Sequence, residues 1–177
     1  MLGGIRSGKS AVAERLVGAA ALQTGSTVTY VATGPRLDDP DWAERIAAHQ
    51  RRRPPPGGPV ESTHLPSALA GLTGPAVIDS LGTWLTAQLD DLDAWGTPRP
   101  AWEPAIDHRV AALVRAVEHH PQHLVLVSDE VGLTLVPDNR AGRIFVDWLG
   151  LTNQRVATVC DAVQLVVAGH VVPVKQP

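Results

Sequence analysis

Residues 3–10 of the chain read GGIRSGKS and match the pattern G-x-x-x-x-G-K-S. In loops of this pattern, successive backbone N–H groups form a cradle for phosphate oxygens, and the lysine reaches the terminal phosphates of a nucleotide. The serine hydroxyl can ligate Mg²⁺, and the N-terminus of the helix that begins at Ser10 adds positive partial charge. The stretch therefore predicts a bound nucleoside triphosphate. By itself it does not separate a kinase from a hydrolase, a motor or a nucleotide sensor.

Helical and strand patterns alternate along the rest of the chain, which predicts an α/β fold with a mainly parallel sheet. The predicted helices cover residues 10–25, 40–53, 67–72, 81–92, 105–119 and 138–161. The prolines within residues 95–104 are expected to break the helical pattern there. The predicted strands cover residues 26–33, 76–79, 123–130, 163–169 and 171–175. Pro173 removes a ladder donor, so the last strand is expected at a sheet edge.

Length and charge narrow the classes of protein that the chain can represent. Its 177 residues, 44% of them hydrophobic, suit one domain that covers residues 1–177. A net charge of −3 gives no broad basic field for a nucleic acid. No apolar run approaches the roughly 20 residues of a membrane span, and the N-terminus lacks a signal-peptide layout, so we expect a cytoplasmic protein. The lone Cys160 is expected to be a buried structural thiol.

Two carboxylates follow apolar strands and are candidate magnesium ligands together with Ser10. Asp79 ends the strand of residues 76–79, and Glu130 ends the strand of residues 123–130. Phosphate-loop proteins place such carboxylates in the magnesium shell, at the edge where the strands of a parallel sheet end. A solvated strand-end acid is the alternative for each of them. Asp129 should point to the opposite face from Glu130 and is the weaker candidate.

His49 lies in the predicted helix of residues 40–53, on the border between an apolar face and a stripe of arginines. An imidazole in that setting can attack a phosphorus atom while the arginines neutralise the phosphate oxygens. The spacing alone does not establish a nucleophile, because a histidine at the edge of a solvated charged face fits the pattern as well. A second histidine cluster at His119, His120 and His123 is not assigned a metal site.

Several ordered blocks together resemble one family, the bifunctional adenosylcobinamide kinase / adenosylcobinamide-phosphate guanylyltransferases. GGIRSGKS resembles the GG-x-RSGKS loop of the family, and ERIAAHQRRRP (44–54) resembles its R-I-x-x-H helix. The segment DEVGLTLVPDNRAGRIFVDWLGLTNQRVA (129–157) resembles an E-V-G-x-G-I-V-P-x-N…R-x-F-x-D-x-x-G-R-x-N-Q block. The strand and turn YVAT…LDD and the C-terminal residues 161–175 also match, so the resemblance spans nearly the whole chain.

The resemblance implies a RecA-like phosphate-loop NTPase fold, a homo-oligomer that is a trimer in at least one member, and two activities. In the family, the histidine that matches His49 takes GMP from GTP and passes it to adenosylcobinamide phosphate, giving adenosylcobinamide-GDP. The same proteins phosphorylate adenosylcobinamide with a nucleoside triphosphate, ATP or GTP. The matching nucleotide-binding positions are Gly3, Gly4, Ile5, Arg6, Ser7, Gly8, Lys9, Ser10, Thr33, Gly34, Pro35, Gln50, Arg51, Arg52, Arg53, Glu61 and Asp79.

The chain departs from the family pattern at Leu151, where arginine is usual, at Asp129, where asparagine is common, and at Ser80 and Gly82. Two other functions stay open: a phosphate-loop kinase of another small metabolite, and a nucleotide-binding remnant without catalysis. The front of the chain is also short. Met1 and Leu2 are too few for a usual strand before the loop, so we expect a truncated first strand and a natural start upstream of Met1.

Overall fold

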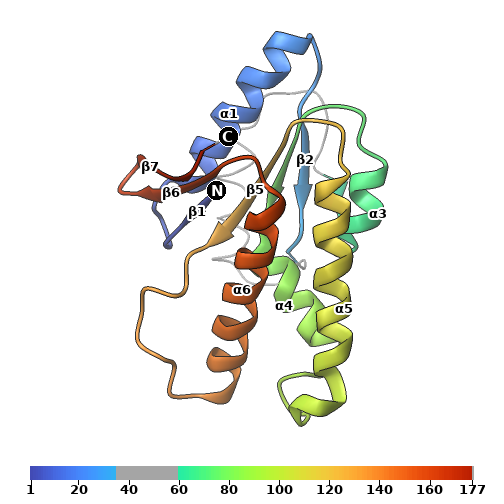
Figure 1. The fold of residues 1–177 in the computed structure, drawn as a ribbon, viewed down its shortest axis with the longest axis vertical. Helices are drawn as coiled ribbons and strands as arrows, with labels where there is room; N and C mark the ends of the chain where they lie inside the picture. The colour runs from blue at the N-terminus through green and yellow to red at the C-terminus, as the bar shows by residue number, and fades with distance from the viewer. Residues whose placement is uncertain (35–59, 177) are drawn as a thin grey trace.

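The computed structural model describes residues 1–34 and 60–176, which build a seven-stranded sheet with the order β3-β2-β4-β5-β1-β6-β7 (Figure 1). Neighbouring strands are parallel except for β6 and β7, which pair antiparallel. The strands are β1 Leu2–Gly3, β2 Thr29–Ala32, β3 Val60–Glu61, β4 Ala76–Asp79, β5 Leu124–Asp129, β6 Val163–Val167 and β7 His170–Lys175. The predicted α/β fold with a mainly parallel sheet and a C-terminal edge strand is confirmed.

Five helices are described in these residues: α1 Lys9–Thr24, α3 Leu65–Ala70, α4 Leu81–Asp91, α5 Arg99–Glu118 and α6 Arg140–Val159. The helix α1 starts directly after Gly8 and ends at Gly25, and both glycines have left-handed backbone angles, which glycine adopts without steric cost. The helix α6 starts after Asn139, whose side chain accepts a hydrogen bond from the N–H of Gly142 at 2.7 Å. The predicted helix of residues 40–53 lies outside the described residues.

The two faces of the sheet are covered by different helices, because side chains of a strand alternate between faces. Val125 and Val127 of β5 pack with Ala13 and Val17 of α1. Leu126, between the two valines, joins the larger core formed with α3, α4, α5 and α6. Figure 1 shows α5 and α6 lying side by side over this face. The sheet is thus a middle layer, and the carboxyl ends of its strands are open to the loops that follow them.

The first strand is truncated, as predicted, and consists of Leu2 and Gly3. Leu2 and Gly3 pair with Ser128 and Asp129 of β5 on one side and with β6 on the other. The Met1 ammonium group continues this ladder by donating to the carbonyl of Leu126 at 2.9 Å. The two neighbouring strands thus hold this short strand from both sides.

The helix α5 begins at Arg99, six residues before the predicted start, so the expectation that the prolines break this segment is wrong. Pro100 lies in the first turn, where a backbone N–H has no partner within the helix. Pro104 removes one hydrogen bond from the next turn. Trp102 offsets this loss because its side chain is buried, packs edge-on against Trp148, and donates from Nε1 to the carbonyl of Thr97.

None of the helices in residues 1–34 and 60–176 is long and apolar enough to cross a membrane.

Replacing Leu113 by alanine tests whether the core between α5 and the sheet carries the stability of the fold. Leu113 is fully buried in this core, so Leu113→Ala should lower the free energy of unfolding in urea by about 2–5 kcal/mol. Leu22→Ala is the matched control, because the Leu22 side chain on α1 is 86% exposed and its loss should change the free energy by less than about 0.5 kcal/mol. Equal effects of the two substitutions would contradict this packing.

Candidate functional site

The predicted phosphate loop lies at the carboxyl edge of the sheet, between β1 and α1. The strand β5 separates β1 from β4, so the ends of three neighbouring strands meet beside the loop. Gly4, Ile5, Arg6 and Gly8 are exposed, while Ser7, Lys9 and Ser10 are half-buried. The backbone amides of the loop are therefore held open to an incoming anion at the edge where parallel sheets bind ligands.

Contacts from both neighbouring strands fix the shape of the loop. The carbonyl of Gly3 accepts from the N–H of Glu130 at 3.1 Å, and the carbonyl of Ser7 accepts from the N–H of Gly169 at 2.8 Å. Gly8, with a φ of +94°, packs against Gly169. Arg6 also has a positive φ, of 57°, which side-chain-bearing residues seldom adopt. The loop is thus held in one conformation by the end of β5 and by the turn between β6 and β7.

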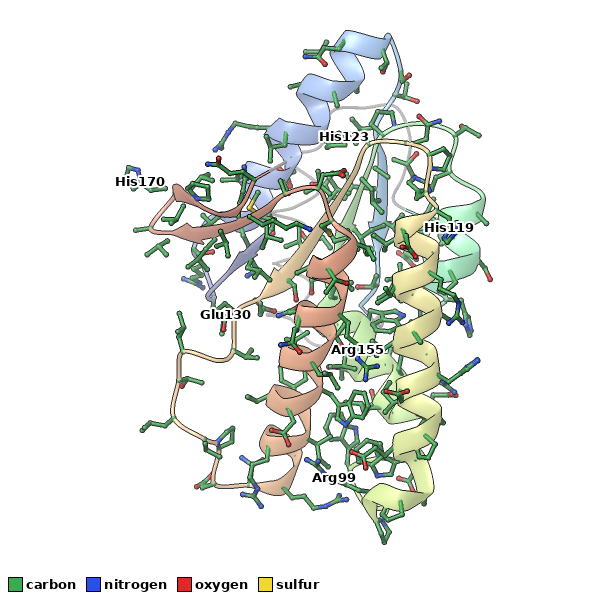
Figure 2. The ribbon with its side chains drawn as sticks, in the orientation of Figure 1. Arg99, His119, His123, Glu130, Arg155 and His170 are labelled. Carbon is green, nitrogen blue, oxygen red and sulfur yellow. The ribbon has the colours of Figure 1, made fainter. Side chains whose placement is uncertain are left out.

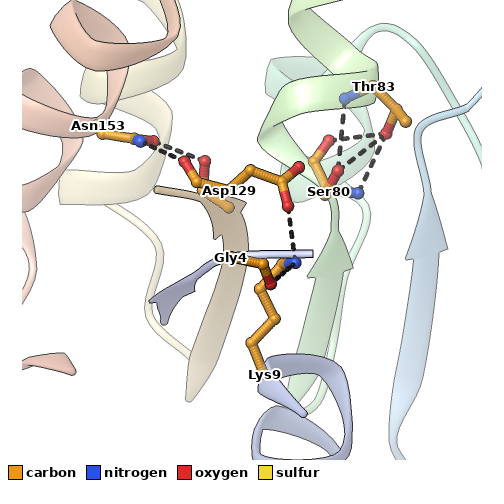
Figure 3. A network of polar contacts seen from close by, with 7 residues as sticks. Gly4, Lys9, Ser80, Thr83, Asp129 and Asn153 are labelled. Atoms are coloured by element: carbon orange, nitrogen blue, oxygen red, sulfur yellow. Dashed lines mark hydrogen bonds and ion pairs between the residues drawn. The ribbon is translucent and has the colours of Figure 1, made fainter. Parts of the chain in front are cut away.

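The ammonium group of Lys9 forms an ion pair with Asp129, with Nζ 2.6 Å from Oδ1, and donates to the carbonyl of Gly4 at 3.2 Å (Figure 3). The side chains of Lys9 and Asp129 are 12% and 31% exposed. Register explains the pairing, because Asp129 of β5 lies opposite Gly3, the last residue before the loop. The loop lysine is therefore already oriented, with one of its three N–H groups left for a phosphate oxygen.

Asn153 of α6 holds the end of β5 in place. Its side-chain amide donates to the carbonyl of Asp129 at 3.0 Å, and its oxygen accepts from the hydroxyl of Ser128 at 2.6 Å. Asn153 is 8% exposed and Ser128 is 2% exposed, so both bonds are sheltered from water. The residues alone did not point to this role, although Asn153 belongs to the N-Q pair in the block of residues 129–157 that resembles the family.

Hydroxyl groups hold the adjacent connection between β4 and α4. The hydroxyl of Thr33, a predicted nucleotide-binding residue, donates to the carbonyl of Ser80 at 2.6 Å and accepts from the N–H of Ser80 at 3.0 Å. It also lies 2.7 Å from the hydroxyl of Thr83, which belongs to the capping box at the start of α4. The Thr33 side chain is completely buried and serves this turn. Asp79 is half-buried directly before it, at the end of β4.

The two acids at the end of β5, Asp129 and Glu130, differ in what they contact. Asp129, which the sequence did not favour, reaches Lys9, whereas the Glu130 carboxylate accepts from the N–H of Gly132 in its own connection at 2.6 Å. Figure 2 shows Glu130 where β5 ends, His123 where β5 begins and His119 at the end of α5. A metal-binding role for Glu130 stays a prediction. In the described part of the chain, no three His, Cys, Asp or Glu side chains cluster closely enough to hold a metal ion by themselves.

The remaining predicted site residues fall into two groups. Glu61 is exposed at the end of β3, and Gly34 is half-buried after β2. The strand β3 is the edge strand beyond β2, so Glu61 is separated from β1 by three strands. The other predicted residues lie outside the described residues: Pro35, His49, Gln50, Arg51, Arg52 and Arg53.

A cavity of about 380 Å³ lies away from the loop, where β5 and β6 begin. It is lined by residues that include Met1, Leu124, Val163, His120 and Cys160. Burial lowers the pKa of the Met1 ammonium group and of His120, and it raises the pKa of the Cys160 thiol. Cys160, which was expected to be buried, is half-buried at this cavity.

Comparison with known proteins agrees with the resemblance. The sequence model of the family described as cobinamide kinase / cobinamide phosphate guanyltransferase matches residues 1–174. The bifunctional adenosylcobalamin biosynthesis protein CobU of Salmonella typhimurium is 38% identical, over 98% of this chain and 97% of that protein. CobU of Escherichia coli is 36% identical over 98% and 97% of the two chains, and CobP of Pseudomonas aeruginosa is 36% identical over 99% and 95%.

Gly3→Ala tests the close packing of the loop. A Cβ at Gly3 would lie 2.5 Å from Oγ of Ser7 and 2.7 Å from the carbonyl oxygen of Val166, so the loop must shift. We expect a loss of about 1–3 kcal/mol in the free energy of unfolding, measured in urea. Gly4→Ala is the matched control, because a Cβ there meets nothing within 4 Å. A Gly3→Ala protein as stable as Gly4→Ala would show that the loop is not held as described.

Proposed function

The chain belongs to the cobinamide kinase / cobinamide phosphate guanyltransferase family, and on that premise we propose that it carries out both reactions in cobalamin biosynthesis. In the kinase reaction, the hydroxyl of adenosylcobinamide is phosphorylated by ATP or GTP. In the transferase reaction, GMP passes from GTP to adenosylcobinamide phosphate, giving adenosylcobinamide-GDP. The observation that carries the proposal is the loop of residues 3–10, held by β5 and by the β6–β7 turn and with Lys9 oriented, in a chain that matches the family over residues 1–174.

The loop supplies the electrostatic part of both reactions. Its amides and Lys9 bind the triphosphate and stabilise the charge that develops on the phosphate oxygens as a bond to phosphorus breaks. Oxygen ligands suit Mg²⁺, and the proposed ligands are the Ser10 hydroxyl, the Asp79 carboxylate at the end of β4 and the Glu130 carboxylate directly after β5. Bound Mg²⁺ would neutralise phosphate charge there. The buried hydroxyls of Thr33, Ser80 and Thr83 keep the end of β4 in one conformation without adding charge.

We assign the GMP-carrying step to His49, on the support of the R-I-x-x-H resemblance and the arginines that follow it in the sequence. A ring nitrogen attacks the α-phosphorus of GTP, a P–N bond forms, and the P–O bond to pyrophosphate breaks. A phosphate oxygen of adenosylcobinamide phosphate then attacks the same phosphorus, and the P–N bond breaks to restore the histidine. Gln50, Arg51, Arg52 and Arg53 are proposed to contact the nucleotide, with Pro35 and Glu61.

Further properties stay predictions from the sequence. The resemblance supports a homo-oligomer, with a trimer as the expected form, and the composition supports one domain of residues 1–177 in the cytoplasm. Magnesium as a cofactor, with Ser10, Asp79 and Glu130 among its ligands, is likewise a prediction from the sequence. If the chain instead phosphorylates another metabolite, His49 is dispensable; if it only binds nucleotide, no pyrophosphate is released.

The first test is covalent labelling with GTP that carries ³²P on the α-phosphate. We expect label that is labile in acid and stable in base, as a phosphoramidate is, together with release of pyrophosphate. His49→Ala should abolish the label. His119→Ala is the matched control, because His119 is exposed at the end of α5, away from the loop, and its loss should leave labelling unchanged. Folded wild-type protein that takes no label would exclude the His49 mechanism.

The second test asks whether one triphosphate site serves both reactions. Lys9→Ala should lower the rate of His49 labelling and the rate of adenosylcobinamide phosphorylation together, each by roughly 100-fold, because the oriented cation at the loop is lost. Lys175→Ala is the control, since Lys175 donates to carbonyls at the end of α6 instead. A Lys9→Ala enzyme that loses one activity and keeps the other would show that the two reactions use different sites.

A further inference from the structure

The carboxylate that contacts the loop lysine is the feature that the proposed function leaves unused. Oδ1 of Asp129 lies 2.6 Å from Nζ of Lys9, the lysine of the predicted phosphate loop. Two of the three N–H directions of the ammonium group are taken, by Asp129 and by the carbonyl of Gly4. A triphosphate that binds here meets a lysine whose charge is already neutralised, and a negative charge beside it.

The surroundings hold Asp129 in that position. Asn153 donates to its backbone carbonyl, and the backbone N–H of the next residue, Glu130, is bound to Gly3. On the other side, Gly82 in the first turn of α4 leaves room for the carboxylate, since a Cβ at Gly82 would lie 3.1 Å from Oδ2 of Asp129. The carboxylate of Asp129 therefore occupies space that is free because Gly82 has no side chain.

We infer that Asp129 is a positioning residue that keeps Lys9 in an ion pair when no nucleotide is bound. A triphosphate with a divalent cation displaces Asp129 from Lys9 more readily than a triphosphate without one. Without a metal, the carboxylate and the phosphate oxygens repel each other at short range in a partly buried site. A divalent cation would neutralise part of the phosphate charge, and the Asp129 carboxylate would be one of the oxygen groups able to hold it. Asp129 thus makes nucleotide affinity depend on magnesium. This inference rests on the proposed function only in taking the loop as a triphosphate site.

Glu130 and Asp79 are less suited to this role. The Glu130 carboxylate is bound to the N–H of Gly132 in its own connection. Asp79 ends β4, and β5 lies between β4 and the strand that leads into the loop. Asp129 is the carboxylate that reaches Lys9 in the described part of the chain.

The test measures the affinity of the protein for GTP and for inorganic tripolyphosphate by calorimetry. Each ligand is titrated once with about 5 mM Mg²⁺ and once with EDTA in place of the metal. Asp129→Asn keeps the shape and an oxygen that accepts from Lys9, but it removes the charge. We expect it to raise the metal-free affinity for both ligands about tenfold and to reduce the gain from Mg²⁺ by the same factor, because the two binding events are linked. Asp138→Asn, an exposed charge in the connection between β5 and α6, should change neither value.

Gly82→Thr gives a second variant that keeps the Asp129 side chain. Its added atoms crowd Oδ2 of Asp129, so it should also raise the metal-free affinity, and it should have no further effect in the Asp129→Asn background. Circular dichroism and thermal unfolding establish that each variant is folded. If Gly82→Thr raises the metal-free affinity equally in the Asp129→Asn background, Gly82 does not act through the Asp129 carboxylate, and this part of the inference is wrong.

The outcomes distinguish this inference from the proposed function. If Asp129→Asn leaves the ratio of the affinities with and without Mg²⁺ as it is in the wild type, the inference is wrong, even where both reactions proceed. If tripolyphosphate follows the expected pattern but GTP does not bind, the inference holds and the proposed function fails. Wild-type protein that binds no tripolyphosphate in the presence of Mg²⁺ would overturn the inference as well.

Discussion

The pairing of the two-residue strand β1 between β5 and β6 is the constraint on which the rest of the site depends. It places the loop of residues 3–10 beside the end of β5, and it sets Gly3 opposite Asp129, so that the next turn of chain brings Lys9 to that carboxylate. Because the strand itself is so short, rigidity comes from its neighbours, through the N–H groups of Glu130 and Gly169. The conformation of the predicted phosphate loop therefore depends on the centre of the sheet as well as on the loop sequence.

The two strand ends beside the loop are organised differently. At the end of β4, the neutral hydroxyls of Thr33, Ser80 and Thr83 satisfy one another and the backbone. At the end of β5, a charged pair faces the loop, and Asn153 secures it from α6. A site that must bind a highly charged ligand benefits from this division, since the neutral network fixes geometry while the charged one responds to the ligand.

Much of the fold was predictable from the sequence, because it depends on local patterns. The loop GGIRSGKS indicated its strand and helix, Gly25 ended α1, and Asp79 ended β4. The start of α5 was not predictable, since the burial of Trp102 outweighs the breaking tendency of Pro104 only in the folded protein. The same holds for the partner of Lys9. Choosing Asp129 over Glu130 requires the strand order and register, which bring distant residues together and leave no mark in local spacing.

The bond from Gly169 to the carbonyl of Ser7 links the two ends of the sequence. Gly169 lies in the turn that joins β6 to β7, and β7 is exposed along its whole length at the edge of the sheet. A displacement of that hairpin reaches the loop directly, through this bond, the contact of Gly8 with Gly169 and the pairing of β6 with β1. The segment that is synthesised last is thus mechanically among the nearest neighbours of the segment that is synthesised first.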